Sequence, residues 1–104
     1  DKEKRPLMGK IGAEGCDLCI VTSDNPRSEE PQAIIDDILS GMDSKARPKV
    51  IVDRREAIAW AVQNARKDDI IVLMGKGQEP YQEIRGEKLH LDEREEVAKA
   101  LTSL

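Results

Sequence analysis

The sequence predicts one small α/β domain, in which helices alternate with the strands of a mostly parallel sheet. Short apolar runs rich in β-branched residues alternate along the chain with amphipathic segments long enough to form helices. Strands separated by helices in this way are normally joined by right-handed crossovers into a parallel sheet. The length of 104 residues fits one domain, which could bury roughly two thirds of its unfolded surface.

The first half of the chain predicts the order helix, strand, helix, strand. Residues 5–15 (RPLMGKIGAEG) indicate a short helix ending in glycine, and residues 16–23 (CDLCIVTS) indicate a strand. Residues 29–42 (EEPQAIIDDILSGM) predict a helix, since an acidic first turn and Pro31 suit a helix N-terminus. The apolar face of this helix would hold Ile34, Ile35, Ile38, Leu39 and Met42. Residues 49–53 (KVIVD) predict the next strand.

The second half continues the alternation. Residues 55–66 (REAIAWAVQNAR) predict a helix whose inner face is formed by Ile58, Ala61, Val62 and Ala65. Residues 69–75 (DIIVLMG) form a nearly continuous apolar run, which is typical of a parallel strand covered on both sides. Residues 83–91 (EIRGEKLHL) indicate a hairpin about Gly86. Residues 92–104 predict a closing helix, with these residues facing inward: Val97, Ala98, Leu101 and Leu104.

Composition argues against nucleic acid and membranes as partners. The 17 basic and 21 acidic residues give a net charge of -4 and are mixed along the chain, so no basic patch is indicated. Trp60 and Tyr81 are the only aromatic residues, which leaves few surfaces on which bases could stack. No apolar stretch approaches the ~20 residues that span a bilayer, and the polar start DKEKRP is unlike a signal peptide. We therefore expect a cytoplasmic protein.

The two cysteines have the C-x-x-C spacing of redox and zinc sites, but the context favours structural residues. If residues 16–23 form a strand, Cys16 and Cys19 point to opposite faces and lie about 10 Å apart, which is too far for a disulfide. His90 is the single histidine, so a tetrahedral zinc site lacks ligands. We interpret both cysteines as buried, unbridged and metal-free, and His90 as structural. No catalytic residue is assigned.

Two polar loops follow predicted strands, at the edge of an open α/β sheet where ligands bind. In the first, Asp24-Asn25-Pro26-Arg27, the proline restricts the backbone around it and so directs Arg27. A directed arginine suits a carboxylate or a phosphate. The alternative is a solvated turn in which Arg27 pairs with Glu29 or Glu30.

The second loop, residues 75–83 (GKGQEPYQE), is not a phosphate loop, because Gly77 follows Lys76 where that motif needs Ser or Thr. Gly75 and Gly77 instead permit a sharp turn that brings backbone close to a ligand. Glu79 would supply an anionic partner for that ligand. A plain turn is the alternative.

Together with their flanks, these loops resemble the Mur ligase family. The segments VTSDNPRSEEPQAIIDDILSGM, IVLMGKGQEPYQEI and LDEREEVAKAL are similar to the C-terminal domain of these ligases, and the similarity extends over essentially the whole chain. The DNPR motif is specific for the branch that adds meso-diaminopimelate to the peptidoglycan precursor. The resemblance and the patterning together predict a Rossmann-like three-layer domain over residues 1–104, with a mostly parallel sheet and a C-terminal hairpin strand pair.

The resemblance also implies an activity for the longer enzyme. ATP converts the D-glutamate side chain of UDP-MurNAc-L-Ala-D-Glu into an acyl phosphate, and the amine of meso-diaminopimelate attacks it. Other domains of such enzymes hold the UDP-sugar, ATP and Mg²⁺, while the C-terminal domain presents the amino acid. The isolated chain is therefore expected to be inactive.

By motif, the resemblance assigns diaminopimelate binding to six residues: Asp24, Asn25, Pro26, Arg27, Gly75 and Glu79. Arg27 would hold the distal carboxylate, and Glu79 the distal ammonium. A lysine-adding ligase is an alternative, although an arginine left unpaired in a closed site is costly. A non-catalytic amino-acid-binding module is another.

Two departures from the family pattern matter. Gln78 stands where the family usually has histidine, so any role of that histidine passes to Gln78 or is lost. The family also places an arginine and a strand just before the position of Asp1. We therefore expect that the domain is cut just inside its start and that part of its sheet is unpaired.

Overall fold

The computed structural model describes residues 2–23, 29–74, 81–84, 87–102 and 104. Within these ranges a short 3₁₀ turn opens the chain, and helices then alternate with short strands. The elements are η1 (Lys2–Lys4), α1 (Arg5–Gly15), β1 (Ile20–Val21), α2 (Pro31–Leu39), β2 (Lys49–Val50), α3 (Arg54–Asn64), β3 (Tyr81–Ile84), β4 (Glu87–His90) and α4 (Glu93–Thr102).

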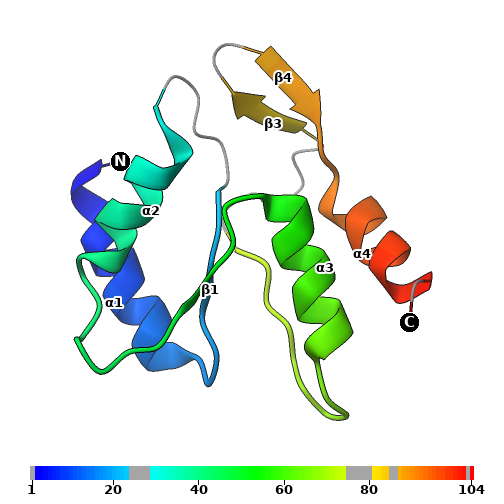
Figure 1. The fold of residues 1–104 in the computed structure, drawn as a ribbon, viewed down its shortest axis with the longest axis horizontal. Helices are drawn as coiled ribbons and strands as arrows, with labels where there is room; N and C mark the ends of the chain where they lie inside the picture. The colour runs from blue at the N-terminus through cyan, green and yellow to red at the C-terminus, as the bar shows by residue number, and fades with distance from the viewer. Residues whose placement is uncertain (1, 24–28, 75–80, 85–86, 103) are drawn as a thin grey trace.

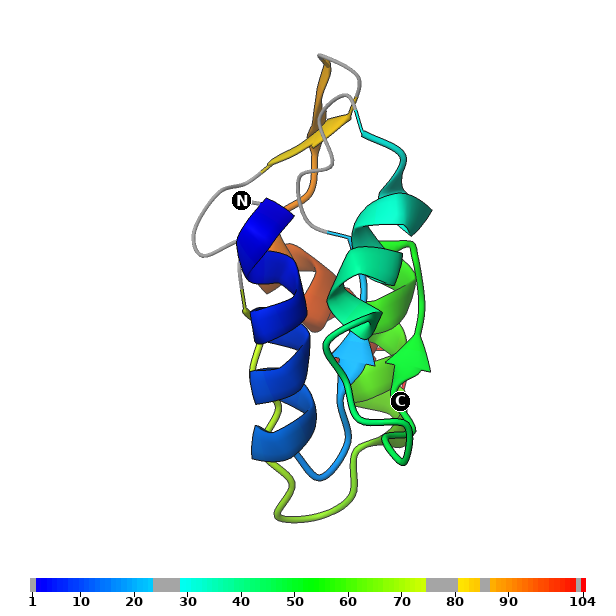
Figure 2. The ribbon, with the colours of Figure 1, turned by 90° about the vertical axis from the view of Figure 1, so that its left-hand side faces the viewer.

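The strands β1 and β2 pair in parallel, with Ile20 opposite Lys49 and Val21 opposite Val50. The backbone contact continues past the strands, because the amide of Ser23 donates to the carbonyl of Val52 at 3.2 Å. Figure 1 shows α1 and α2 on one side of β1, with α3 and α4 on the other, and in Figure 2 the first two helices lie in front of the strand pair. The α/β class and the parallel pairing are confirmed.

A second strand pair is separate from the first. The strands β3 and β4 are antiparallel, with Tyr81 opposite His90 and Ile84 opposite Glu87. In Figure 1 this pair stands apart from the helices, at one end of the molecule. The position predicted for the turn, Gly86, lies outside the described residues.

The helices of the first half follow the sequence prediction closely. The helix α1 has the predicted bounds, Arg5–Gly15. In α2, Ile35 is completely buried, and the rest of the predicted apolar face is half-buried. The buried apolar side chains of the described residues are few, and none is aromatic: Val21, Ile35, Ala57, Ile58, Leu91 and Ala100.

The helices α1 and α2 approach each other through glycines. A Cβ atom at Gly9 would lie 1.9 Å from the backbone oxygen of Ile38, and one at Gly41 would lie 1.7 Å from the oxygen of Pro6. Both distances are impossible for real atoms, so any side chain at either position forces the backbones apart. The glycines therefore allow α2 and the turn after it to lie close against α1.

The strand predicted over residues 16–23 is shorter than expected, and one interpretation based on it is wrong. Cys16 lies in an exposed position after the end of α1, before β1 begins at Ile20. It is therefore not buried. Cys19 is half-buried, and this burial raises the pKa of its thiol. Both cysteines are free thiols.

The covered strand predicted over residues 69–75 is not present in the described part, residues 69–74. Its apolar side chains face solvent, with Ile70, Val72 and Met74 between 70% and 88% exposed. In the described part of the chain no strand pairs with this segment. The apolar pattern predicts that this segment is buried, but the described residues of the segment are exposed.

Four residues predicted to face inward are exposed instead: Ala65, Ala98, Leu101 and Leu104. In α4 the buried positions are Glu93 and Ala100. The prediction from apolar positions assumed that Glu93 faces outward. It was therefore wrong about which face of α4 is buried. For α4 the physical reason is the partner of Glu93, described below, whereas Ala65 lies just beyond the end of α3.

The contact between α1 and α2 predicts opposite effects at two glycines of α1. Gly9→Ala should lower the free energy of unfolding by about 1–3 kcal/mol, because the added methyl group overpacks the contact with Ile38. Gly15→Ala is the matched control, because a Cβ there meets nothing within 4 Å. It should raise the free energy of unfolding by roughly 0.4–1 kcal/mol. Denaturant unfolding measures both, and equal midpoints for the two variants would contradict the close contact.

Candidate functional site

Four buried polar side chains gather where β1 ends, and we call them the buried polar cluster: Ser23, Arg54, Gln82 and Glu93. Each comes from a different element. Ser23 follows β1, Arg54 begins α3, Gln82 lies in β3, and Glu93 begins α4. The cluster therefore joins segments from both halves of the chain.

Arg54 is the centre of the cluster. Its Nε and Nη2 atoms donate to Oε2 of Glu93 at 2.9 and 2.6 Å. Its Nη1 atom donates to the backbone oxygen of Ser23 at 3.2 Å, and Nη2 also donates to that of Met74 at 2.9 Å. The side chains of Arg54 and Glu93 are only 6% and 8% exposed. The charge is thus almost fully removed from water, and it is stable there because the guanidinium donors have close acceptors.

Ser23 is held from three directions. Gln82 Nε2 donates to its hydroxyl oxygen at 3.0 Å, Arg54 binds its carbonyl, and its own amide donates to Val52. A residue bonded through its amide, its carbonyl and its side chain has little freedom. The backbone leaving β1 is therefore fixed up to Ser23.

The two carbonyls bound by Arg54 belong to the stems of the two predicted binding loops. Ser23 immediately precedes the first loop, and Met74 immediately precedes the second. The six predicted site residues lie outside the described residues: Asp24, Asn25, Pro26, Arg27, Gly75 and Glu79. Among the described residues, one guanidinium brings together the last backbone carbonyl of each stem.

The far side of the first loop is held by Arg5. This arginine of α1 donates to both carboxylate oxygens of Glu29 at 2.8 and 3.0 Å, and to Asp37 of α2 at 3.0 Å. The hydrogen bond with Glu29 is the largest cause that raises the pKa of Arg5 above its usual value. Glu29 was one of the two partners suggested for Arg27, and here it is bound by Arg5.

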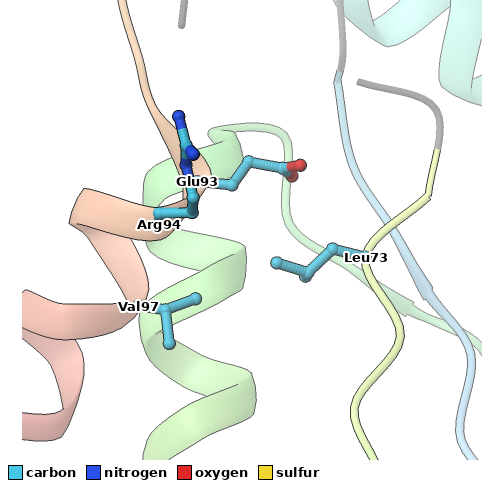
Figure 3. Close-up of a pocket in the computed structure, with 4 residues that line it drawn as sticks. All are labelled: Leu73, Glu93, Arg94 and Val97. Carbon is cyan, nitrogen blue, oxygen red and sulfur yellow. The ribbon is translucent and has the colours of Figure 1, made fainter. Parts of the chain in front are cut away.

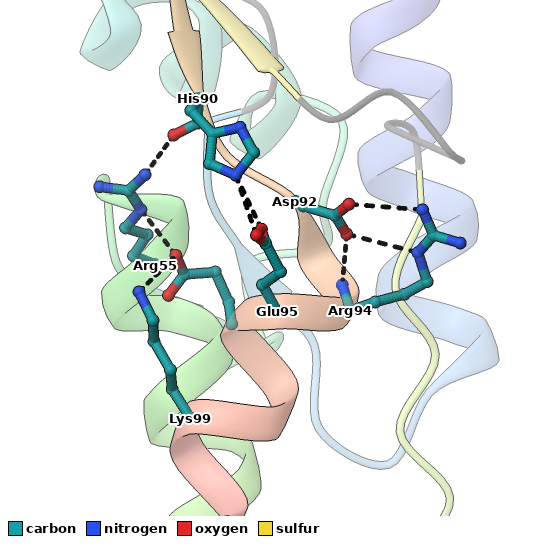
Figure 4. Close-up of polar contacts among 7 residues, drawn as sticks. Arg55, His90, Asp92, Arg94, Glu95 and Lys99 are labelled. Carbon is teal, nitrogen blue, oxygen red and sulfur yellow. Dashed lines mark hydrogen bonds and ion pairs between the residues drawn. The ribbon is translucent and has the colours of Figure 1, made fainter.

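Outside the buried polar cluster, exposed contacts hold the start of α4 (Figure 4). Arg55 Nε lies 2.9 Å from Glu96, and Arg55 also donates to the backbone oxygen of His90. His90, exposed rather than buried, contacts Glu95 at 2.7 Å. Asp92 accepts from the amide of Arg94 at 2.9 Å, and the side-chain hydrogen bond from Arg94 is the main cause that lowers the pKa of Asp92.

An open hollow of about 390 Å³ lies beside Glu93, between α4 and the segment 69–74 (Figure 3). It is lined by Leu73, Glu93, Arg94 and Val97. Its two charged side chains already have partners, since Glu93 binds Arg54 and Arg94 binds Asp92. Its free surface is apolar, so we assign it no polar ligand.

The described residues offer no metal site, because no group of three His, Cys, Asp or Glu side chains among them could hold a metal ion. The helices of the described part are also too short or too polar to cross a membrane.

Known proteins match this chain along its whole length. A sequence profile described as "Mur ligase, glutamate ligase domain" matches residues 1–77. The chain belongs to the Mur ligase family. It is 53% identical over its full length to the UDP-N-acetylmuramoyl-L-alanyl-D-glutamate–2,6-diaminopimelate ligase of Clostridioides difficile, of which it covers 22%. The ligase of the same name from Gloeobacter violaceus is 51% identical over 98% of the chain, which covers 21% of that relative.

A solved structure of a ligase with the same name shares the fold. It superposes with a TM-score of 0.93 at 44% identity, and the match covers 99% of this chain and 21% of that one. The chain thus spans about a fifth of the length of the relatives it matches. The membership of the family that the sequence motifs indicated is confirmed.

Sequence reasoning missed the buried polar cluster, although a signal was present. The rule that ligands bind beyond the carboxyl ends of parallel strands directed attention to the loops after two predicted strands. The same rule applies after the strand that ends near Asp53, where Arg54 follows directly. Glu93 gave no comparable signal, because it stands among four acidic residues in DEREE.

The contact between Ser23 and Gln82 predicts a thermodynamic coupling. Gln82→Met should lower the free energy of unfolding by about 1–3 kcal/mol, because it leaves the buried hydroxyl without its donor. The double variant Ser23→Ala/Gln82→Met should cost less than the sum of the two single variants, since it removes both polar groups. Denaturant unfolding of the four proteins measures the coupling, and strictly additive losses would show that the contact contributes nothing.

Proposed function

We propose that this chain is the C-terminal, amino-acid-presenting domain of an ATP-dependent ligase that joins meso-2,6-diaminopimelate to UDP-MurNAc-L-Ala-D-Glu. The observation that carries the proposal is the identity of 53% over the whole chain with a ligase of that name. The DNPR sequence at residues 24–27 supports it. The acceptor substrate is a nucleotide-linked sugar peptide, so we place the protein in the cytoplasm.

The chemistry assigns a binding role to this domain. In the ligation, the D-glutamate side chain is activated as an acyl phosphate, the amine of diaminopimelate attacks it, and phosphate leaves. Mur ligases in general use ATP and Mg²⁺, which we assign to the other domains. The contribution of this chain is to hold the amino acid so that its reacting amine is oriented, which converts a bimolecular encounter into a positioned reaction.

The six loop residues, Asp24, Asn25, Pro26, Arg27, Gly75 and Glu79, are proposed to form the amino-acid site. Diaminopimelate differs from lysine by its distal carboxylate. A planar guanidinium matches a carboxylate with two parallel hydrogen bonds. Arg27 is therefore the residue that distinguishes the two amino acids, while Glu79 holds the distal ammonium.

We further propose that the complete domain is a Rossmann-like three-layer unit in which residues 69–74 form a strand and β3 and β4 form the C-terminal hairpin. The support is the continuous apolar run of residues 70–74 together with its exposure in this chain. A segment of such composition is expected in the middle of a parallel sheet, with a neighbouring strand beside it.

An upstream strand should therefore stabilise the domain. We expect the chain extended upstream by about 15 residues of its natural sequence, roughly one strand and its connections, to unfold at a higher denaturant concentration than the chain alone. It should also unfold with a steeper slope, because more surface is buried. Equal midpoints and equal slopes would mean that the extra strand contributes nothing and that residues 69–74 are not part of a larger sheet.

In the full-length enzyme, Arg27→Ala should lower kcat/KM for diaminopimelate by about 2 to 3 kcal/mol of transition-state stabilisation, the range for a hydrogen bond to a charged group. The same change should lower kcat/KM for lysine much less, because lysine has no distal carboxylate for Arg27 to hold. Arg27→Lys should restore little, since an ammonium lacks the planar fork. Glu79→Gln should weaken the binding of diaminopimelate, because it removes the negative charge that pairs with the distal ammonium.

The assay compares both amino acids with each variant at saturating ATP and UDP-MurNAc-dipeptide. The wild-type enzyme should prefer diaminopimelate strongly. If it uses lysine equally well, or if Arg27→Ala lowers kcat/KM for both amino acids alike, Arg27 does not select the substrate.

A further inference from the structure

Arg54 connects the two loop stems directly, through their backbone carbonyls. Its guanidinium binds the carbonyl of Ser23 and the carbonyl of Met74 at 3.2 and 2.9 Å. These residues are 51 positions apart in the sequence, and each directly precedes a loop that carries residues of the proposed amino-acid site. One rigid group thus sets the separation of the two stems.

We infer that Arg54 is a positioning residue for amino-acid binding, oriented by Glu93, and that the pair fixes the spacing between the two loop stems at Ser23 and Met74. The inference rests on the proposed function. Arg54 touches no substrate in this assignment, and its effect is exerted through the backbone of Ser23 and Met74. The substrate class it serves is a diamino acid whose two distal charges are recognised by residues of different loops.

The geometry requires an arginine at this position. Three segments present acceptors to Arg54 from different directions, namely the stems at Ser23 and Met74 and the carboxylate of Glu93. A guanidinium has five donors in a fixed plane, and an ammonium is a point charge on a flexible stem. Lysine could reach one or two of these acceptors, and it could not hold all of them at set distances.

Glu93 fixes the orientation of Arg54. Its Oε2 atom accepts from both Nε and Nη2, so the guanidinium plane is clamped on the side facing α4. The remaining donors are then directed at the stems. A substitution of Glu93 should therefore change how Ser23 and Met74 are held, even though α4 itself carries none of the proposed site residues.

A second ion pair between the same two helices provides a matched control. Arg55 of α3 lies 2.9 Å from Glu96 of α4, and like Arg54–Glu93 it bridges α3 and α4. In contrast to Arg54, Arg55 contacts the carbonyl of His90 and not a loop stem. A variant that lacks the second pair therefore tests the effect of losing an ion pair between α3 and α4 without changing a contact to a loop stem.

The test uses the full-length ligase with two double variants, Arg54→Met/Glu93→Leu and Arg55→Met/Glu96→Leu. Replacing both members of a buried pair with apolar residues of similar volume avoids an unpaired charge and is often neutral for stability. The Arg54 and Glu93 variant should raise KM for diaminopimelate about tenfold or more, and it should lower the preference for diaminopimelate over lysine. KM for ATP and for UDP-MurNAc-dipeptide should stay within about twofold. The Arg55 and Glu96 variant should keep all three values within about twofold.

The inference is overturned if the folded Arg54 and Glu93 variant keeps the wild-type KM for diaminopimelate, or if both double variants raise it alike. Thermal unfolding of each protein checks that it is folded. If the first double variant does not fold, Arg54→Lys replaces it under the same criterion, because it keeps the charge beside Glu93. A wild-type enzyme that does not ligate diaminopimelate would instead refute the proposed function, which separates the two failures.

Discussion

The ion pair between Arg54 and Glu93 is the interaction on which the arrangement of this domain depends. Removing two charges from water costs several kcal/mol per ion, and that cost is offset only when the donors and acceptors find partners. Here the partners include the carboxylate and two backbone carbonyls from distant segments. The pair is therefore stable only when β1, the segment 69–74, α3 and α4 are all in place. It thereby couples segments from both halves of the chain.

The helices could be predicted from the sequence because they depend on local patterns. The rotation of α4 could not be predicted, because it depends on this coupling between distant segments. The bounds of α1 and the apolar face of α2 follow from local spacing and from the glycine and proline at their ends. The rotation of α4 depends on Glu93, whose partner is 39 residues away in the sequence. Apolar spacing places Leu101 inside, whereas a carboxylate bound to a buried arginine turns the helix so that Leu101 is 54% exposed.

The prediction of a strand over residues 69–75 failed for a related reason. A strand forms only when a neighbouring strand is hydrogen-bonded to it, whereas apolar composition indicates only that a segment tends to be buried. Residues 49–53 found a partner in β1, and the resulting pair is short but regular. Residues 69–74 have the stronger apolar signal, yet in the described part of the chain no strand pairs with them. The candidate site divides in the same way. Local motifs indicated the loop residues, whereas the buried polar cluster depends on tertiary contacts.

The charge balance of the cluster also bears on substrate selection. An unneutralised arginine at the two loop stems would attract any carboxylate and would weaken the distinction between amino acids with and without one. Glu93 contacts Arg54 at 2.6 Å in an environment largely closed to water, so the pair presents almost no net charge at a distance. In the proposed assignment, the positive charge available to a ligand is that of Arg27. If Arg27 binds the distal carboxylate as proposed, the group that sets the backbone geometry, Arg54, is separate from the group that selects the substrate, so Arg54 can be rigid and buried without limiting that selection.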